Sequence, residues 1–185
     1  IETHQGTSTG PLLSGFAYQY DDNGNRTSEE QTRTTWAGGL EAEVTTYGDG
    51  SAPGSAGSGY DAVNRLKLVT YNALDTDPSK RQILTYGYDL SGNRTFEQEK
   101  DGTGAIKREK HLDFNGASWL VDIWADAQKT QKLEHYETDA NGNLVQKVDY
   151  AADPDEVTTY AFDVRDHMRS VTTSADTFYF DYSAD

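Results

Sequence analysis

An aspartate that recurs along the chain constrains the fold more than any other feature. Seven aspartates each follow a stretch rich in large side chains, and they are Asp21, Asp61, Asp89, Asp113, Asp139, Asp163 and Asp181. Successive members are 40, 28, 24, 26, 24 and 18 residues apart, the first gap being widened by a Gly/Ser-rich insert. A repeat of this kind predicts one supersecondary unit used many times, rather than a fold built around a solitary active site.

The residues before these aspartates predict strands. Phe16, Tyr18 and Tyr20 alternate with small or polar residues, and a period of two is typical of a strand with one packed face. The alternation recurs before three later aspartates, at Leu84, Tyr86 and Tyr88, at Tyr160 and Phe162, and at Phe178 and Phe180.

The residues after the aspartates predict reversals of the chain. Aspartate at the first position and glycine at the fourth favour a type I turn closed by a left-handed residue. The pairs are Asp21 with Gly24, Asp89 with Gly92, Asp113 with Gly116 and Asp139 with Gly142, and we expect positive φ at all four glycines. In the copies at Asp61 and Asp163 the fourth place is held by Asn64 and Asp166, which tolerate that conformation. The predicted unit is a β-hairpin.

The predicted fold class is all-β, with consecutive antiparallel β-hairpins in a curved, open sheet. Only 35% of the 185 residues are hydrophobic and tyrosine accounts for 12, which favours a single extended sheet over a double-layered core. Residues 1–13 are expected to be a flexible N-terminal linker. Residues 14–185 are expected to form the sheet, with a mobile Gly/Ser-rich insertion at 48–59 and an end that truncates a repeat.

Composition and motif spacing exclude several kinds of site. The net charge of −15 opposes nucleic-acid binding, no apolar run is long enough to insert in a membrane, and the absence of cysteine excludes disulfides and thiolate metal sites. Asp139-Ala-Asn-Gly-Asn143 begins like a calcium loop, but the sixth and twelfth positions are Leu144 and Tyr150 where glycine and glutamate are needed. We therefore interpret these segments as turns.

Three copies carry a resemblance to a known family. They read Tyr20-Asp21-Asp-Asn-Gly-Asn-Arg26, Tyr60-Asp61-Ala-Val-Asn-Arg-Leu66 and Tyr88-Asp89-Leu-Ser-Gly-Asn-Arg94. They resemble the YD repeat of Rhs-family proteins, which include bacterial polymorphic toxins, cocoon subunits of insecticidal toxin complexes, wall-associated proteins and animal teneurins. The resemblance implies a ribbon of hairpins that coils into a hollow shell, which in the toxins encloses a C-terminal toxic domain.

The chain also departs from the family pattern. Leu112 and Thr138 replace the tyrosine before Asp113 and Asp139, and Asp153-Pro-Asp-Glu156 does not match the Asp-Pro-x-Gly of the family's self-cleavage region. The resemblance therefore implies a segment of shell wall without protease or cargo, belonging to a larger secreted or cell-surface protein.

The chemical inventory predicts no enzyme, no cofactor and no metal. The histidines are His4, His111, His135 and His167, and no Gly-x-Ser-x-Gly motif accompanies them. A metal site formed by His111, Asp113 and His135 is a less favoured alternative that requires neighbouring hairpins to bring the three together.

Several partner hypotheses remain open. Neighbouring repeats of the parent chain are the first expected partner, and an enclosed C-terminal toxin domain is the second. Glycans are the third, because the exposed rings of tryptophans such as Trp119 and Trp124 can stack on sugar rings. The alternative is that both tryptophans pack across strands. The two edge strands of an open sheet also predict edge-to-edge self-association, which the negative charge opposes.

Overall fold

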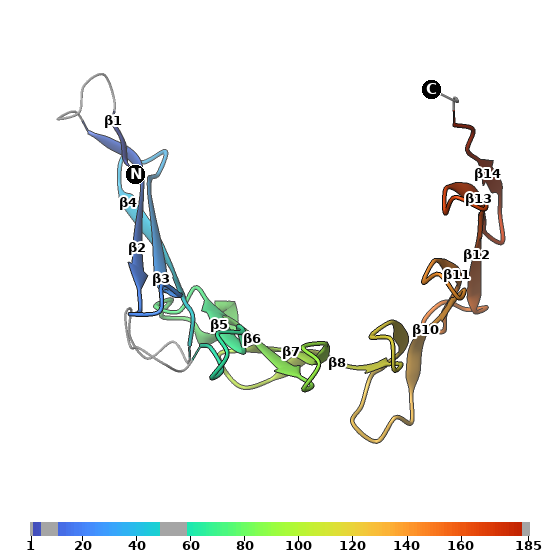
Figure 1. Cartoon of the computed structure of the whole chain (residues 1–185). Helices are drawn as coiled ribbons and strands as arrows, with labels where there is room; N and C mark the ends of the chain where they lie inside the picture. Colours follow the sequence, from blue (N-terminus) through green and yellow to red (C-terminus); the bar gives the residue numbers. More distant parts are fainter. Residues whose placement is uncertain (1, 5–10, 49–58, 183–185) are drawn as a thin grey trace. The chain divides into compact units, whose positions relative to one another are not determined.

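The computed structural model describes residues 2–4, 11–48 and 59–182. Its described residues form fourteen strands and one short 3-10 helix, η1 (Pro78–Lys80). The strands pair in the order of the sequence, from β1 to β14, in one open antiparallel sheet (Figure 1). The predicted all-β fold of consecutive antiparallel hairpins in an open sheet is thus confirmed. No helix in the described ranges is long and apolar enough to cross a membrane.

The strand bounds follow the alternating segments of the sequence. The first seven strands are β1 (Glu2–His4), β2 (Leu12–Tyr20), β3 (Arg26–Thr34), β4 (Leu40–Thr46), β5 (Leu68–Tyr71), β6 (Gln82–Tyr88) and β7 (Arg94–Asp101). The remaining seven are β8 (Ile106–Phe114), β9 (Leu120–Trp124), β10 (Lys132–Thr138), β11 (Leu144–Asp149), β12 (Glu156–Phe162), β13 (Met168–Thr172) and β14 (Thr177–Tyr179). In β12, half-buried Thr158, Tyr160 and Phe162 alternate with exposed neighbours, as a strand with one packed face requires.

The chain divides into two compact units, which are described separately. Unit 1 comprises Ile1–Gly87 and Glu97–Arg108, and unit 2 comprises Tyr88–Phe96 and Glu109–Asp185. Within each unit, every second connection lies at the same end of the strands, because an antiparallel meander reverses at each step. The predicted aspartate turns occupy this end, which we call the aspartate-turn end.

Burial differs between the units. Among the described residues of unit 1, the buried side chains are those of Thr27, Ser28, Val44, Thr46, Val69, Thr70, Ala73 and Asp101, with Val69 only 1% exposed. In the described part of unit 2, Ile123 is the one buried side chain apart from glycines. Most unit 2 side chains are half-buried, as expected for a sheet that is a single layer thick.

The N-terminal segment differs from the expected linker. Glu2–His4 form β1, which pairs with β2 through Glu2 opposite Gly15 and Thr3 opposite Ser14. β2 itself begins at Leu12, so Leu12 and Leu13 also belong to the sheet. Strand pairing therefore extends into a stretch whose polar, Gly/Thr-rich composition suggested a loose end. Most of the predicted insertion, residues 49–58, and the last three residues of the chain, 183–185, lie outside the described residues.

Candidate functional site: the aspartate turns and neighbouring polar clusters

The turn at Asp21 shows how the repeated aspartate reverses the chain. The Gly24 N–H donates to the Asp21 carbonyl at 3.0 Å, and the Asp21 N–H donates to the Asn25 carbonyl at 2.9 Å. The Asp21 carboxylate accepts the N–H groups of Asn23 (3.0 Å) and Asn25 (2.8 Å). Gly24 has φ of 81°, a conformation that costs other residues energy because of their Cβ atom.

Four more copies share this geometry. The turns at Asp61, Asp89, Asp139 and Asp163 are closed by left-handed residues, namely Asn64 (φ 63°), Gly92 (93°), Gly142 (91°) and Asp166 (60°). In each, the aspartate carboxylate accepts the N–H of the fifth residue, which is Arg65, Asn93, Asn143 or His167. The carboxylate therefore closes the turn in every one of these copies.

These bonds lower the pKa of the turn carboxylates, because they stabilise the charged form. The side-chain amides of Asn25, Asn93 and Asn143 make the largest contribution to lowering the pKa of Asp21, Asp89 and Asp139. For the other two turns the largest contribution comes from backbone N–H groups, that of Arg65 lowering the pKa of Asp61 and that of Arg165 lowering the pKa of Asp163.

The predicted turn from Asp113 to Gly116 is wrong. Gly116 is not among the residues with positive φ, and the reversal lies two residues later, between Asn115 and Ser118. The Asn115 carboxamide oxygen accepts the N–H groups of Ala117 (2.9 Å) and Trp119 (3.1 Å), and Ser118 takes the left-handed conformation with φ of 62°. A carboxamide oxygen can replace the carboxylate here, since both accept the same backbone donors. The sequence did not predict this turn, because serine seldom adopts the left-handed backbone conformation that Ser118 has here.

Side-chain bonds link neighbouring turns in a regular way. The Asn25 amide donates to its own Asp21 (2.9 Å) and also to Asn64 of the next turn (2.9 Å). In unit 2 the Asn93 amide donates to Asp89 (2.8 Å) and to Ser118 of the next turn (3.2 Å).

The same bridge recurs once more in unit 2. The Asn143 amide donates to Asp139 (3.0 Å) and to Asp166 of the next turn (2.7 Å). Gly-Asn turns therefore alternate with turns whose left-handed residue has an accepting side chain. The structural period is two turns, or four strands, which the single-turn repeat in the sequence concealed.

The predicted turn residue Asp181 has a different setting. Its carboxylate is 3.3 Å from Arg169, its side chain is 94% exposed, and the residues that would complete a turn lie beyond the described range. The neighbouring Phe180 donates its N–H to the Arg169 carbonyl at 2.9 Å, which extends pairing past the end of β14.

The predicted aromatic residues before the aspartates pack in different ways. Tyr60 donates its hydroxyl to the Arg26 carbonyl at 3.0 Å, and its ring stacks with that of Tyr47. Tyr20 is exposed, whereas Tyr88 and Phe162 are half-buried at the ends of their strands. The Arg26 guanidinium lies 4.7 Å from the ring centroid of Tyr18, so an arginine after the turn also covers an aromatic before it.

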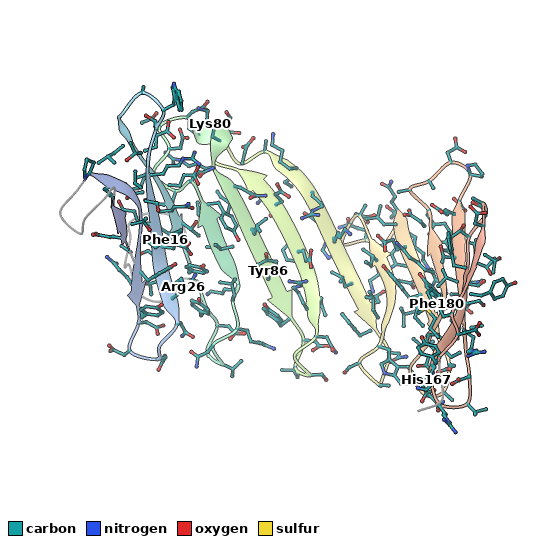
Figure 2. The ribbon with its side chains drawn as sticks, turned by 90° about the horizontal axis from the view of Figure 1, so that it is seen from above. Phe16, Arg26, Lys80, Tyr86, His167 and Phe180 are labelled. Carbon is teal, nitrogen blue, oxygen red and sulfur yellow. The ribbon has the colours of Figure 1, made fainter. Side chains whose placement is uncertain are left out.

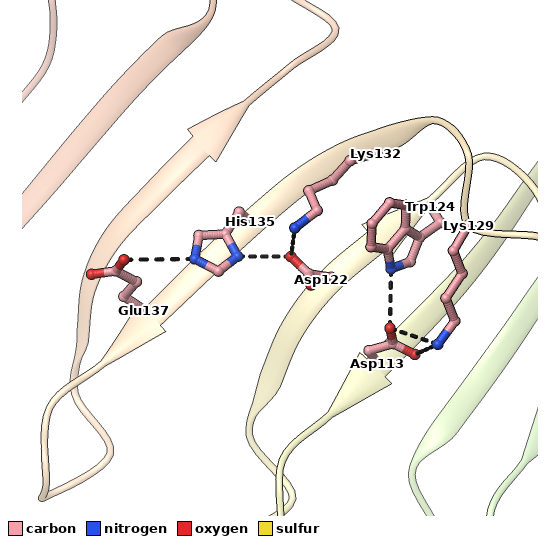
Figure 3. A network of polar contacts seen from close by, with 7 residues as sticks. All are labelled: Asp113, Asp122, Trp124, Lys129, Lys132, His135 and Glu137. Carbon is pink, nitrogen blue, oxygen red and sulfur yellow. Dashed lines mark hydrogen bonds and ion pairs between the residues drawn. The ribbon is translucent and has the colours of Figure 1, made fainter.

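A polar cluster occupies β8, β9 and the β9–β10 turn of unit 2 (Figure 3). Asp113 lies on β8, where its carboxylate accepts the Trp124 indole N–H at 3.0 Å and the Lys129 ammonium at 2.7 and 2.8 Å. Lys129 is itself left-handed, with φ of 56°, in the turn that begins at Asp126. Asp113 therefore ties a strand to a turn at the end opposite the aspartate-turn end.

A second polar cluster lies beside the first (Figure 3). The Asp122 carboxylate is 2.7 Å from Lys132 and 2.7 Å from Nδ1 of His135, whose Nε2 is 3.6 Å from Glu137. Burial pushes the pKa of Asp122 upward, but hydrogen bonds and charges of Lys132 and His135 outweigh it and lower that pKa. The cluster binds β9 to β10 through the half-buried side chains of Asp122, Lys132 and His135, whereas Glu137 is 56% exposed.

The histidines and carboxylates proposed as an alternative metal site are separately paired. His111 is 2.9 Å from Glu109 and its ring contacts Phe96, Asp113 binds Lys129, and His135 binds Asp122. Across the ranges the structure describes, no group of three or more metal-ligating side chains is close enough to hold an ion. His4 lies in β1, and His167 is 3.5 Å from Asp163 within its turn.

The two tryptophans considered for glycan contact make packing contacts. Trp124 bonds Asp113, and the Lys132 ammonium lies 4.7 Å from its ring centroid. Trp119 lies against the next turn, since a Cβ atom placed on Gly142 would be 2.9 Å from Cζ2 of Trp119. Gly142 is thus required both by its positive φ and by the neighbouring indole.

Comparisons with known proteins identify the fold but no family. No family model matches the sequence, and no curated protein matches it. Among 23 matching chains of solved structures, one in the crystal structure of TcdB2-TccC3-Cdc42 has a TM-score of 0.59 and 13% sequence identity. The match covers 92% of this chain and 9% of that chain, so the present chain corresponds to a small part of its neighbour's length. The chain therefore has a fold similar to that of a segment of the TcdB2-TccC3 complex.

Proposed function

We propose that this chain is a non-catalytic segment of a YD-repeat shell that encloses or presents a toxin or effector domain of a larger secreted or surface protein. The observation that carries the proposal is the pairing of every strand with its neighbours in sequence, from β1 to β14. A chain built this way lengthens by adding hairpins, each of which needs only the hairpin before it. Such a design suits a wall.

The structural neighbour supports the same proposal. The fold is similar to a segment of the solved TcdB2-TccC3-Cdc42 structure, and the Tyr-Asp-x-x-Gly-Asn-Arg copies of this chain resemble the YD repeat of Rhs-family proteins. The similarity extends over nearly the whole described sheet at low identity. This similarity supports the proposal that the chain is a segment of a shell wall.

The side chains best suited to acid–base chemistry or metal binding instead make contacts between strands. Asp122, Lys132 and His135 hold β9 to β10, and Asp113 holds β8 to the next turn. The contacts of Trp119 and Trp124 likewise favour packing over the alternative of a carbohydrate-binding or adhesion module. These contacts support a structural role for both clusters.

Protease protection in the longer protein that contains this chain tests the proposal. If the wall encloses a domain, that domain is digested more slowly in the intact protein than when expressed alone. Gly142→Val should open the wall and abolish the protection, whereas Leu90→Ser at a fully exposed turn tip should preserve it. Equal digestion of the domain in the intact protein and alone would refute enclosure.

A further inference from the structure

One strand of unit 1 is longer than its partner. β4 pairs with β3 along its whole length, from Thr46 opposite Ser28 to Leu40 opposite Thr34. On its other side it pairs with β5 only at Thr46, opposite Thr70. One more bond follows, from the Ala73 N–H to the Val44 carbonyl at 2.8 Å. On this side, the part of β4 from Leu40 to Glu43 has no partner strand within the described residues.

The register shows which backbone groups are open. The Tyr47 N–H donates to Thr27 and the Thr35 N–H donates to Gly39, so the odd-numbered residues of β4 direct their backbone groups toward β3. The even-numbered residues Leu40 and Ala42 therefore direct N–H and C=O away from β3. In the part of the chain that the structure describes, no backbone group bonds to them on that side.

The open edge borders a hollow of about 490 Å³. Arg33 and residues 41–44 line one side, and Asn72, Leu74, Asp75 and Lys80 line the other. Lys80 lies away from the aspartate-turn end, which Arg26 marks (Figure 2). The hollow is thus at the end of unit 1 where β4 extends past β5.

Hydrogen bonds hold the far wall of the hollow in place. Asn72 has φ of 51° in a turn in which its carbonyl accepts the Asp75 N–H at 2.9 Å, and its amide donates to the Lys80 carbonyl at 3.2 Å. The Arg81 guanidinium donates twice to the Asp75 carbonyl, at 2.9 and 2.7 Å. Asp77 accepts the Ser79 N–H at the start of η1. These bonds keep the connection from closing onto β4, so the hollow is built into the fold.

We propose that the open edge of β4 binds an extended peptide, which adds to unit 1 as an antiparallel strand. Unpaired N–H and C=O groups along a strand edge recognise another strand through main-chain bonds, with side chains giving specificity. An antiparallel strand opposite Ala42 would bond both open groups of that residue. This site is independent of the proposed role of the whole chain in a wall.

The flanking side chains select the chemistry of the peptide. On one face of β4, Leu40 is 64% exposed, and Leu74 across the hollow is 56% exposed, which favours an apolar ligand side chain opposite Ala42. On the other face Glu41 and Glu43 share the single guanidinium of Arg33, at 3.3 and 3.2 Å. The charged residues that line the hollow are three carboxylates and two cations, namely Glu41, Glu43, Asp75, Arg33 and Lys80, which leaves one negative charge. The chain carries −15 overall, so basic ligand residues are favoured on the face of Glu41 and Glu43. The expected ligand alternates apolar and basic residues.

Titration of the intact chain with acetyl-Lys-Val-Lys-Val-Lys-amide, followed by amide NMR, tests the proposal. We expect saturable shifts at Leu40, Ala42 and Leu74. Two isomeric probes provide the matched control, because only the valine N–H groups would face β4. Backbone N-methylation of both valines should weaken binding at least about tenfold, and backbone N-methylation of two of the three lysines should leave it nearly unchanged.

A variant of the protein tests the same bond from the other side. Ala42→Pro removes the outward N–H while keeping the bonds to β3, and should weaken peptide binding by about tenfold. Equal binding of the two N-methylated probes would overturn the proposal even if this variant failed to fold. Absence of saturation, shifts confined to β14, or a concentration-dependent dimer that Ala42→Pro abolishes would also overturn it, the last in favour of pairing between copies.

Discussion

The two units build the same hairpins but stabilise them differently. The described residues of unit 1 include eight buried side chains other than glycine, and the described part of unit 2 contains Ile123 alone. Unit 1 also has the longer connections, and the one between β5 and β6 includes η1. This connection contacts the sheet, because the Gly102 N–H donates to the Pro78 carbonyl at 2.8 Å. Unit 2 has shorter connections and ties its strands with ion pairs such as Asp122–Lys132. Long connections thus provide cover in unit 1. Unit 2 lacks them and holds its strands together through polar cross-strand contacts, which Arg33 also makes with Glu41 and Glu43 in unit 1.

The largest expected effect tests the buried centre of unit 1. Val69→Asp places a charge where the native side chain is 1% exposed, and should lower the free energy of unfolding by about 4 kcal/mol. Val157→Asp in β12 of unit 2, at a position 40% exposed, should cost less than about 1 kcal/mol. Urea unfolding of both variants checks the difference. Equal destabilisation would contradict the contrast between the units.

A smaller effect distinguishes two left-handed glycines. Gly142→Ala meets both the strain of φ at 91° and the Trp119 ring, and should cost about 3 kcal/mol. Gly24→Ala has the same kind of strain with no atom nearby, and should cost about 1 kcal/mol. Thermal unfolding of the two variants measures the gap. If Trp119→Ala failed to reduce the cost of Gly142→Ala, the packing explanation would be wrong.

Both units should lose stability in acid through the same turns. The pKa values of Asp21 and Asp61 in unit 1, and of Asp89, Asp139 and Asp163 in unit 2, are lowered in the folded state. A lowered carboxyl pKa contributes stability that is present above the unfolded value of about 3.9 and is lost as pH falls through the folded value. The melting temperature should therefore be steady near neutral pH and fall below about pH 4.

Replacing one turn carboxylate provides the control for that pH dependence. Asp139→Asn should lower the melting temperature at pH 7 and flatten its decline in acid, because the replaced group no longer titrates. Calorimetry between pH 7 and pH 3 measures both effects. A decline as steep as in the unmodified chain would show that Asp139 does not contribute.

The smallest expected effect is the coupling between neighbouring turns. A double-mutant cycle on Asn25 and Asn64, each changed to alanine, should give a coupling of about 0.5–1 kcal/mol from the amide bond at 2.9 Å. The equivalent cycle on Asn143 and Asp166 in unit 2 should give a larger value, because the acceptor is a carboxylate. Additive single effects in both units would remove the evidence for a four-strand period.

The sequence predicted local geometry better than contacts between repeats. The period of two located most strands, and the aspartate with glycine three residues later located Gly24, Gly92 and Gly142. It failed at Gly116 because Asn115 can perform the same acceptor role two residues later. Local propensity cannot decide between two adjacent turn signals when the strand itself extends to Phe114.

Features that depend on contacts between several repeats could not be predicted from the sequence. The hydrogen bond from Asn25 to Asn64 joins residues 39 positions apart in the sequence, and the sequence of neither turn predicts this contact. The open edge of β4 arises because β5 is only 4 residues long, a difference in strand length fixed by the following connection. The polar pairing of Asp122 with His135 depends on strand register, which alternation alone leaves undetermined.

Cross-strand NMR contacts test most directly the claim that aspartate turns join strands in the order of the sequence. The register places Tyr18 opposite Glu29 in unit 1 and Tyr160 opposite Val171 in unit 2, both as pairs with close Cα atoms. Strong contacts between the Hα protons of Tyr18 and Glu29, and between those of Tyr160 and Val171, are the predicted result. Contacts from these residues to strands remote in sequence, or sequential amide contacts typical of helix, would contradict it.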